Sequence, residues 1–202
     1  KTYIYKVLKD NEIIKIEGLG INKEGMSVVD SFMTDIFWRV CSEADRFTRV
    51  NNKKTLSDKA VKSAVRMVLP GELRKHAEKQ AEAAVTKYKT YDDDNKDRPL
   101  KKGQTKQKSV TRSAKAGLKF PVGRIARYMR TNSTVHRLNA TAAVFMAAVL
   151  QYLCVEILIV AGALCTSEKK KRITPHHLNL AVKGHEFVEL GQLLGKVTIA
   201  HG

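Results

Sequence analysis

Apolar side chains return every three or four positions along most of the chain, the spacing of helices that bury one face. The longest such stretch of the first half runs from an N-cap at Asn22 to about Val50. Ser57 caps a second helix, and Pro70-Gly71-Glu72 starts a third whose shallow apolar face favours a place on the surface. The pattern predicts an all-α protein. The apolar positions of the long helix are Val29, Phe32, Met33, Ile36, Phe37, Val40, Ala44 and Phe47.

The second half repeats this layout. A long apolar stretch over residues 142–165 is followed by a basic loop and a shorter helix, which Thr174-Pro175 opens as a cap and a first-turn proline. Leu56 and Ile173, at matching places after the two basic loops, are 117 positions apart in the chain. Ala64 and Ala181 keep the same spacing, so the sequence predicts two related helical modules.

The segment of residues 142–165 is long and apolar enough to span a bilayer. Glu156 lies near the middle, however, where a charge costs about 2.5–3.5 kcal/mol on insertion scales. Gln151 adds a second polar group one to two turns earlier. We interpret this stretch as a helix buried on most faces within a protein, and we expect no membrane partner.

A stretch of acidic, basic, Gln and Gly residues over 92–110 has almost nothing to bury and is typical of a solvated linker. The predicted organisation is therefore a first module over residues 1–91, a linker over 92–110 and a second module over 111–202. The final segment, 196–202, is expected to be extended because it contains Val197-Thr198-Ile199.

The formal net charge of +17 and a pI near 9.9 predict a polyanionic partner. The excess of Lys and Arg is spread over both modules, so it is not one basic tail. Cations also gather in the two equivalent loops, Lys53-Lys54-Thr55 and 169–172. Paired cationic loops on a helical scaffold are one way to hold phosphates.

Catalytic and metal-binding patterns are weak. His176 and His177 are adjacent at a helix start and the other four histidines are dispersed. None has a matched carboxylate or thiol spacing, and no short-spaced ligand pair accompanies Cys154 or Cys165. We therefore expect no enzyme, no cofactor, no metal and no small-molecule substrate. No charged-then-apolar leader opens the chain, so a secretory route is not expected, and the three cysteines are interpreted as buried free thiols in a reducing compartment.

Several strings carry a family resemblance. Ala116-Gly117-Leu118-Lys119-Phe120-Pro121-Val122-Gly123-Arg124 and Ala147-Ala148-Val149-Leu150-Gln151-Tyr152-Leu153 closely resemble the type 2A core histone. In the first half, Tyr3-Ile4-Tyr5-Lys6-Val7-Leu8-Lys9 and Leu69-Pro70-Gly71-Glu72-Leu73 resemble the type 2B core histone. Fused pairs of this kind are similar to the doublets encoded by some large DNA viruses.

The resemblance implies two histone folds, each a short, a long and a short helix, that interlock head to tail as an intramolecular handshake pseudo-dimer. It implies a structural protein that wraps double-stranded DNA, largely independently of sequence, in a nucleosome-like particle. The expected partner is a histone 3–histone 4 type doublet or tetramer. The expected location is nuclear chromatin or, for a viral protein, the host nucleus, a cytoplasmic viral factory or the virion.

The resemblance also implies which residues contact DNA. Arg137 and Arg172 match arginines that enter the minor groove in the nucleosome. Arg112, Arg124 and Arg127 match positions in and before the first helix of the type 2A fold. Where the type 2B loop more usually has an arginine, this chain has lysines, which supply charge but no planar fork. The expected DNA-binding residues are Arg137, Arg172, Arg124, Arg127, Lys53, Lys54, Thr55, Arg112, Lys170 and Lys171.

The chain departs from the family in its acidic patch, the surface that receives other chromatin proteins. Glu72, Glu156 and Glu186 remain, so a weakened patch is expected. The other matching positions hold residues without a carboxylate, namely Gln80, Gln151, Ile159, His185 and Phe187. The loop between Lys9 and Ile21 is also about four residues longer than the family's.

An alternative function is an interaction module in a transcription or replication complex, since histone-fold pairs also serve there without wrapping DNA. The C-terminal segment discriminates between the two, because it resembles the docking segment of type 2A histones for the tetramer-forming histone pair. Its expected docking residues are Gly195, Lys196, Val197, Thr198 and Ile199.

Overall fold

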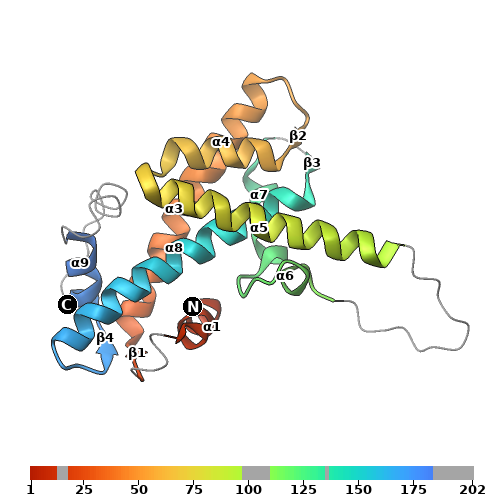
Figure 1. The fold of residues 1–202 in the computed structure, drawn as a ribbon. Helices are drawn as coiled ribbons and strands as arrows, with labels where there is room; N and C mark the ends of the chain where they lie inside the picture. Colours follow the sequence, from red (N-terminus) through yellow and green to blue (C-terminus); the bar gives the residue numbers. More distant parts are fainter. Residues whose placement is uncertain (13–17, 97–109, 135–136, 184–202) are drawn as a thin grey trace, which may run out of the picture.

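The computed structural model describes residues 1–12, 18–96, 110–134 and 137–183, and it is built almost entirely of helices (Figure 1). The first half contains α1 (Thr2–Asp10), β1 (Gly20–Ile21), α3 (Lys23–Val50), β2 (Thr55–Leu56), α4 (Asp58–Val68) and α5 (Gly71–Lys96). The second half contains α6 (Arg112–Lys115), α7 (Val122–Asn132), β3 (Arg137–Leu138), α8 (Ala140–Ser167), β4 (Arg172–Ile173) and α9 (Pro175–Lys183).

The predicted repeat is confirmed in three dimensions. The long helices α3 and α8 each have 28 residues, and each begins two residues after a two-residue strand. From the first strand to the start of the last helix, every element of the second half begins 117 positions after its counterpart. The caps expected at Asn22 and Ser57 are also present, because Asn22 Oδ1 accepts from the Gly25 N–H at 2.6 Å and Ser57 Oγ from the Ala60 N–H at 3.4 Å.

The two halves pair head to tail. β1 of the first half runs parallel to β4 of the second, and β2 of the first half runs parallel to β3 of the second. Each end of the pair thus joins a loop of one half to a loop of the other, while α3 and α8 cross between them (Figure 1). The all-α class and the intramolecular handshake expected from the resemblance are confirmed.

Gly25 permits the close approach at the β1–β4 end. A Cβ at this position would lie 2.8 Å from Asn22 Oδ1 and 3.2 Å from the backbone oxygen of Ile173. The first turn of α3 therefore packs against β4 through a glycine, which ties the cap at Asn22 to the joint between the halves.

α8 is the core helix. Among the described helices it alone has the length and hydropathy of a membrane span, yet 72% of its most apolar window is buried. It contacts α3, α4, α5, α7 and α9, so its partners surround it. Fully burying one Leu or Ile side chain contributes about 1.5–3 kcal/mol, and Leu153, Ile157 and Leu158 are each at most 1% exposed. The interpretation as a buried helix is supported.

The helix after Pro70 lies on the surface, as expected, but its shallow apolar face packs more extensively than the sequence suggested. α5 packs along α8 and buries Leu73, Ala77 and Ala81 against it. Alanine side chains are short, so the two helix axes approach closely and a face of low hydrophobicity still packs well. α5 also continues to Lys96, into the segment expected as a linker, and Asp92 Oδ1 lies 2.7 Å from Lys115 Nζ of α6.

All three cysteines are buried and free, as expected. Burial raises the pKa of Cys154 to about 12, and burial together with the charge of Asp45 raises the pKa of Cys41 to about 11. The thiols of Cys41 and Cys154 therefore stay protonated near neutral pH and are poor nucleophiles.

Candidate nucleic-acid interface

Both long helices end in the same turn before their cationic loops. Asn52 and Lys169 adopt left-handed backbone conformations, with φ of 51° and 56°. The Lys53 N–H donates to the Thr48 oxygen at 3.0 Å, and the Lys170 N–H donates to the Cys165 oxygen at 2.9 Å. This is a Schellman-type ending in each half. It directs the following lysines away from the helix end at equivalent places in the two halves.

At one end of the molecule, Lys53, Lys54 and Thr55 lie beside Arg137, and we call this set the Arg137 loop pair. Thr55 stands opposite Arg137 in the register of β2 and β3, and both side chains are exposed. The next residue, Leu56, is fully buried and accepts the Asn139 N–H at 3.0 Å. Leu56 of the strand pair therefore faces the core, whereas Thr55 and Arg137 face solvent.

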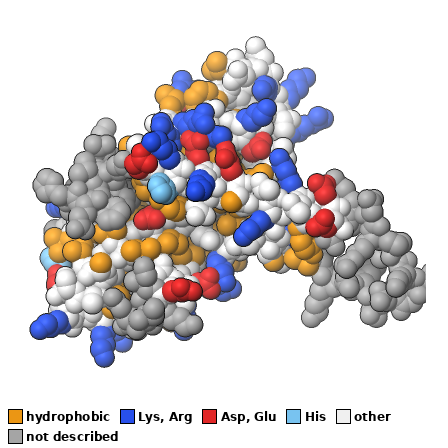
Figure 2. Space-filling view, in the orientation of Figure 1, with side chains coloured by type: hydrophobic (Ala, Val, Ile, Leu, Met, Phe, Trp, Pro, Cys, Tyr) orange, Lys and Arg blue, Asp and Glu red, His pale blue; other side chains and the backbone are white. Residues whose placement is uncertain are grey.

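At the other end, Lys170, Lys171 and Arg172 follow α8, and we call this set the Arg172 loop pair because β4 joins it to β1. Gly20 stands opposite Arg172 and donates its N–H to the Lys171 oxygen at 2.9 Å. Figure 2 shows Lys and Arg side chains over the loop that leads to β2 at upper right and near the loop after α8 at lower left.

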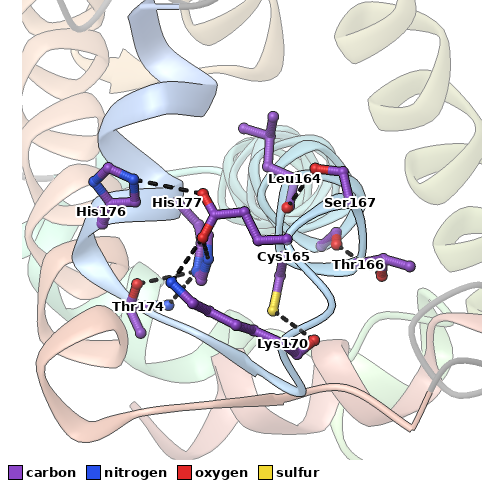
Figure 3. Close-up of polar contacts among 10 residues, drawn as sticks. Leu164, Cys165, Thr166, Ser167, Lys170, Thr174, His176 and His177 are labelled. Carbon is purple, nitrogen blue, oxygen red and sulfur yellow. Dashed lines mark hydrogen bonds and ion pairs between the residues drawn. The ribbon is translucent and has the colours of Figure 1, made fainter.

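A buried histidine holds the Arg172 loop pair in place (Figure 3). His177 is fully buried, and its Nδ1 accepts from the Thr174 N–H at 2.9 Å. Its Nε2 therefore carries the proton and lies 3.2 Å from Glu168 Oε2, which also accepts from Lys170 Nζ at 2.7 Å. The hydrogen bonds from Lys170 and His177 hold the pKa of Glu168 below its usual value despite the opposing effect of desolvation.

The start of α9 at Pro175 was predicted correctly, with Thr174 directly before it. The contribution of His177 was not predicted from the sequence, and its ring accepts the Thr174 N–H as a Glu or Gln side chain does in a capping box. A histidine three residues after a threonine was the available signal. Cys165 Sγ adds a contact to the Lys170 oxygen at 3.2 Å.

A third cationic group lies between the two ends, and we call it the central group. An open cleft of about 890 Å³ separates α1, α6 and α7, and exposed cations from both halves line it. The guanidinium of Arg124 lies 5.3 Å from the ring centroid of Tyr3, which is a cation–π contact between the halves. The cations of the central group are Lys6, Arg112, Lys119, Arg124 and Arg127.

Lys6 and Lys119 were missed from the sequence. The signal for Lys6 was the equivalence of α1 and α7, since a cation on one short helix directs attention to the same face of the other. All ten residues expected to contact DNA are exposed, and the structure gathers them into these three groups.

Of the three carboxylates expected to remain in the acidic patch, Glu72 and Glu156 lie within the described residues. Glu72 Oε1 is 2.6 Å from Lys75 Nζ, and Glu156 is partly buried on α8. Gln151, at a position where the resemblance implies an acidic residue, accepts from the backbone N–H groups of Lys119 at 2.7 Å and Phe120 at 3.1 Å. Its oxygen thus holds the entry to α7. Glu186 and the expected docking residues 195–199 lie outside the described residues.

Comparison with known proteins agrees with this architecture. The core histone domain, which is shared by histones 2A, 2B, 3 and 4, matches residues 1–67 and 100–184. Histone 2A of Chlamydomonas reinhardtii is 54% identical over 102 residues, which are 50% of this chain and 78% of that protein. Histone 2A-III of Volvox carteri is 54% identical over the same shares, and histone 2A of Petroselinum crispum is 53% identical over 50% of this chain and 67% of its own length. The chain belongs to the core histone family.

Proposed function

We propose that the chain is a histone doublet, a 2B-like half followed by a 2A-like half, that wraps double-stranded DNA in a nucleosome-like particle. The observation that carries this proposal is the arrangement of three exposed cationic groups, one at each end of the handshake and one between them. Each group is built where the two halves meet. A function in DNA packaging also accords with membership of the core histone family, which is not an enzyme family.

The dimensions of the fold suit a duplex. Arg137 precedes α8 and Arg172 follows it, and a helix of 28 residues is about 42 Å long. One turn of DNA measures roughly 34–36 Å, so a duplex that touches all three groups follows the protein for more than one turn. We assign Arg137 and Arg172 to the inward-facing minor groove and the central group to phosphates, because the planar guanidinium enters a narrow groove and both kinds of contact ignore base sequence.

The proposed partner is a histone 3–histone 4 type doublet or tetramer, engaged through residues 195–199. This assignment depends on the resemblance of that segment to the type 2A docking segment. It places the protein on packaged DNA, in nuclear chromatin or, for a virus-encoded doublet, in the host nucleus, viral factory or virion.

Reconstitution tests this function. The chain, a histone 3–histone 4 type partner and random-sequence DNA are mixed, and the product is digested with a nuclease. A discrete protected fragment supports wrapping. Continuous degradation despite complex formation supports the second candidate, a histone-fold pair that serves as an interaction module in a transcription or replication complex.

The doublet arrangement has its own test. Because both partners share one chain, the tether sets an effective partner concentration of roughly millimolar. The thermal midpoint of the whole chain should therefore not change with protein concentration. A midpoint that rises with concentration would show that the handshake forms between molecules.

A further inference from the structure

Asp45 is a buried acid close to the proposed DNA surface. It lies on α3 in the first half, and only 6% of the residue is exposed. A buried carboxylate costs free energy unless hydrogen bonds or charges compensate it. A negative charge near bound phosphates is also unfavourable, so its presence needs a structural explanation.

The partners of Asp45 come from the other half of the molecule. Oδ1 accepts from Ser133 Oγ at 2.6 Å and from the Thr134 N–H at 3.1 Å, and Oδ2 accepts from Thr134 Oγ1 at 2.8 Å. Arg49, one turn later on α3, completes the set with Nε at 3.3 Å from Oδ2. Both carboxylate oxygens are therefore used, and three of the four contacts cross between the halves.

These contacts lie where the chain leaves α7. The helix ends at Asn132, and Ser133 is already extended with φ of −92° and ψ of 138°. Arg137 follows three residues after Thr134 and is itself held by the pairing of β3 with β2. Ser133 and Thr134 are thus anchored to α3 through Asp45, and Arg137 is anchored to β2 through the strand pair.

We propose that Asp45 is a positioning residue for Arg137, which sets the direction of the guanidinium toward DNA by holding Ser133 and Thr134. This inference rests on the proposed DNA-binding function. Its action is indirect, because the carboxylate touches the loop and not the nucleic acid.

The proposal predicts an effect opposite in sign to simple electrostatics. Replacing Asp45 with Asn removes a negative charge, so long-range electrostatics alone would tighten DNA binding. Asn has one acceptor oxygen in place of the two that Asp45 offers to Ser133 and Thr134. The substitution should therefore loosen the loop and weaken DNA binding. Asp35→Asn is the matched control, since Asp35 lies on the same helix, pairs with Arg39 at 2.8 Å and has the same charge.

The experiment measures the affinity of the whole chain for a random-sequence duplex at fixed salt, in wild-type and Arg137→Ala backgrounds. We expect Asp45→Asn to weaken binding about three- to tenfold, whereas Asp35→Asn should leave it unchanged or slightly tighter. In the Arg137→Ala background Asp45→Asn should cause no further loss, because there is no guanidinium left to position.

Two results would overturn the inference: Asp45→Asn binding as tightly as Asp35→Asn, or an equal loss in both backgrounds, which would mark a general effect on stability. If Asp45→Asn fails to fold, Thr134→Val serves in its place, because it removes one hydroxyl donor and retains the backbone N–H. Failure of the proposed function gives a different result, because Arg137→Ala would then bind DNA as tightly as the wild type. That result would contradict both the DNA contact of Arg137 and the positioning role of Asp45.

Discussion

Thr55 lies opposite Arg137 in the parallel pairing of β2 with β3, so one exposed surface contains residues of both halves. The same pairing brings Lys53 and Lys54 to that surface. A half-molecule on its own has no such surface, because the strand that orients Arg137 belongs to the other half. Correct pairing of the halves is thus a condition for the proposed DNA contact.

Arg137→Ala and Arg172→Ala should each weaken DNA binding to a similar extent for all sequences. A guanidinium in the minor groove lies close to the phosphates of both strands and displaces bound counterions, so each substitution should reduce the slope of log affinity against log salt by about one. Fluorescence anisotropy titrations between roughly 50 and 200 mM salt measure this slope. Lys79→Ala is the control, since it removes an exposed cation of α5 away from the three cationic groups. An unchanged slope in Arg137→Ala would remove that residue from the interface.

Lys169→Gly should stabilise the protein by about 1 kcal/mol, because Lys169 has a positive φ of 56° that costs a residue with a Cβ more than it costs glycine. Chemical denaturation of the two proteins measures the difference in free energy of unfolding. Lys169→Ala is the control, since it removes the same charge but retains the Cβ. Equal stability of the Gly and Ala variants would show that the backbone conformation is not the cause.

The repeat, the long helices and the two cationic loops were predictable because each depends on local spacing of apolar and charged residues. Asp45 was not predictable in the same way. Its partner Ser133 is 88 positions away, and no pattern within either half links them. The extent of packing by α5 was not predictable either, because the contribution of Ala77 and Ala81 depends on how closely α8 approaches, which only the packed structure defines.

Low pH should remove the stability that Asp45 provides. Burial on its own would raise the pKa of Asp45, but hydrogen bonds from Ser133 and Thr134 and the charge of Arg49 hold the pKa below its ordinary value of 3.8. A carboxyl group with a lowered pKa stabilises the folded state at every pH above 3.8, and this contribution disappears as the pH falls through the folded-state pKa.

Denaturation of the wild type and of Asp45→Asn at a series of pH values tests this. The stability advantage of the wild type should be constant near neutral pH and should shrink only in the acid range. Neighbouring Cys41 does not complicate the result, because its pKa is raised to about 11 and it stays neutral throughout. An advantage that is independent of pH down to full protonation would contradict the proposed ionisation of Asp45.

His177→Ala should lower the free energy of unfolding by about 2–4 kcal/mol, because it leaves a cavity and an unpaired Thr174 N–H. His177→Gln should cost less, since an amide oxygen at this position also reaches the N–H of the capping residue. Thermal denaturation ranks the variants. The same loss for Gln and Ala would indicate that the size of the imidazole, and not its hydrogen bond to Thr174, is what matters.

The Gln151→Glu, Ile159→Glu double variant should bind a peptide with an arginine anchor about tenfold more tightly than the wild type. Ile159 is partly exposed three positions after Glu156 on α8, so a carboxylate there lies on a neighbouring surface of the same helix. At position 151 one carboxylate oxygen can still accept the N–H groups of Lys119 and Phe120, which leaves the other for the arginine. Gln151→Glu, Ile159→Gln controls for polarity without the second charge. If the wild type already binds such a peptide as tightly as the double variant, the acidic patch of the wild type is not weakened.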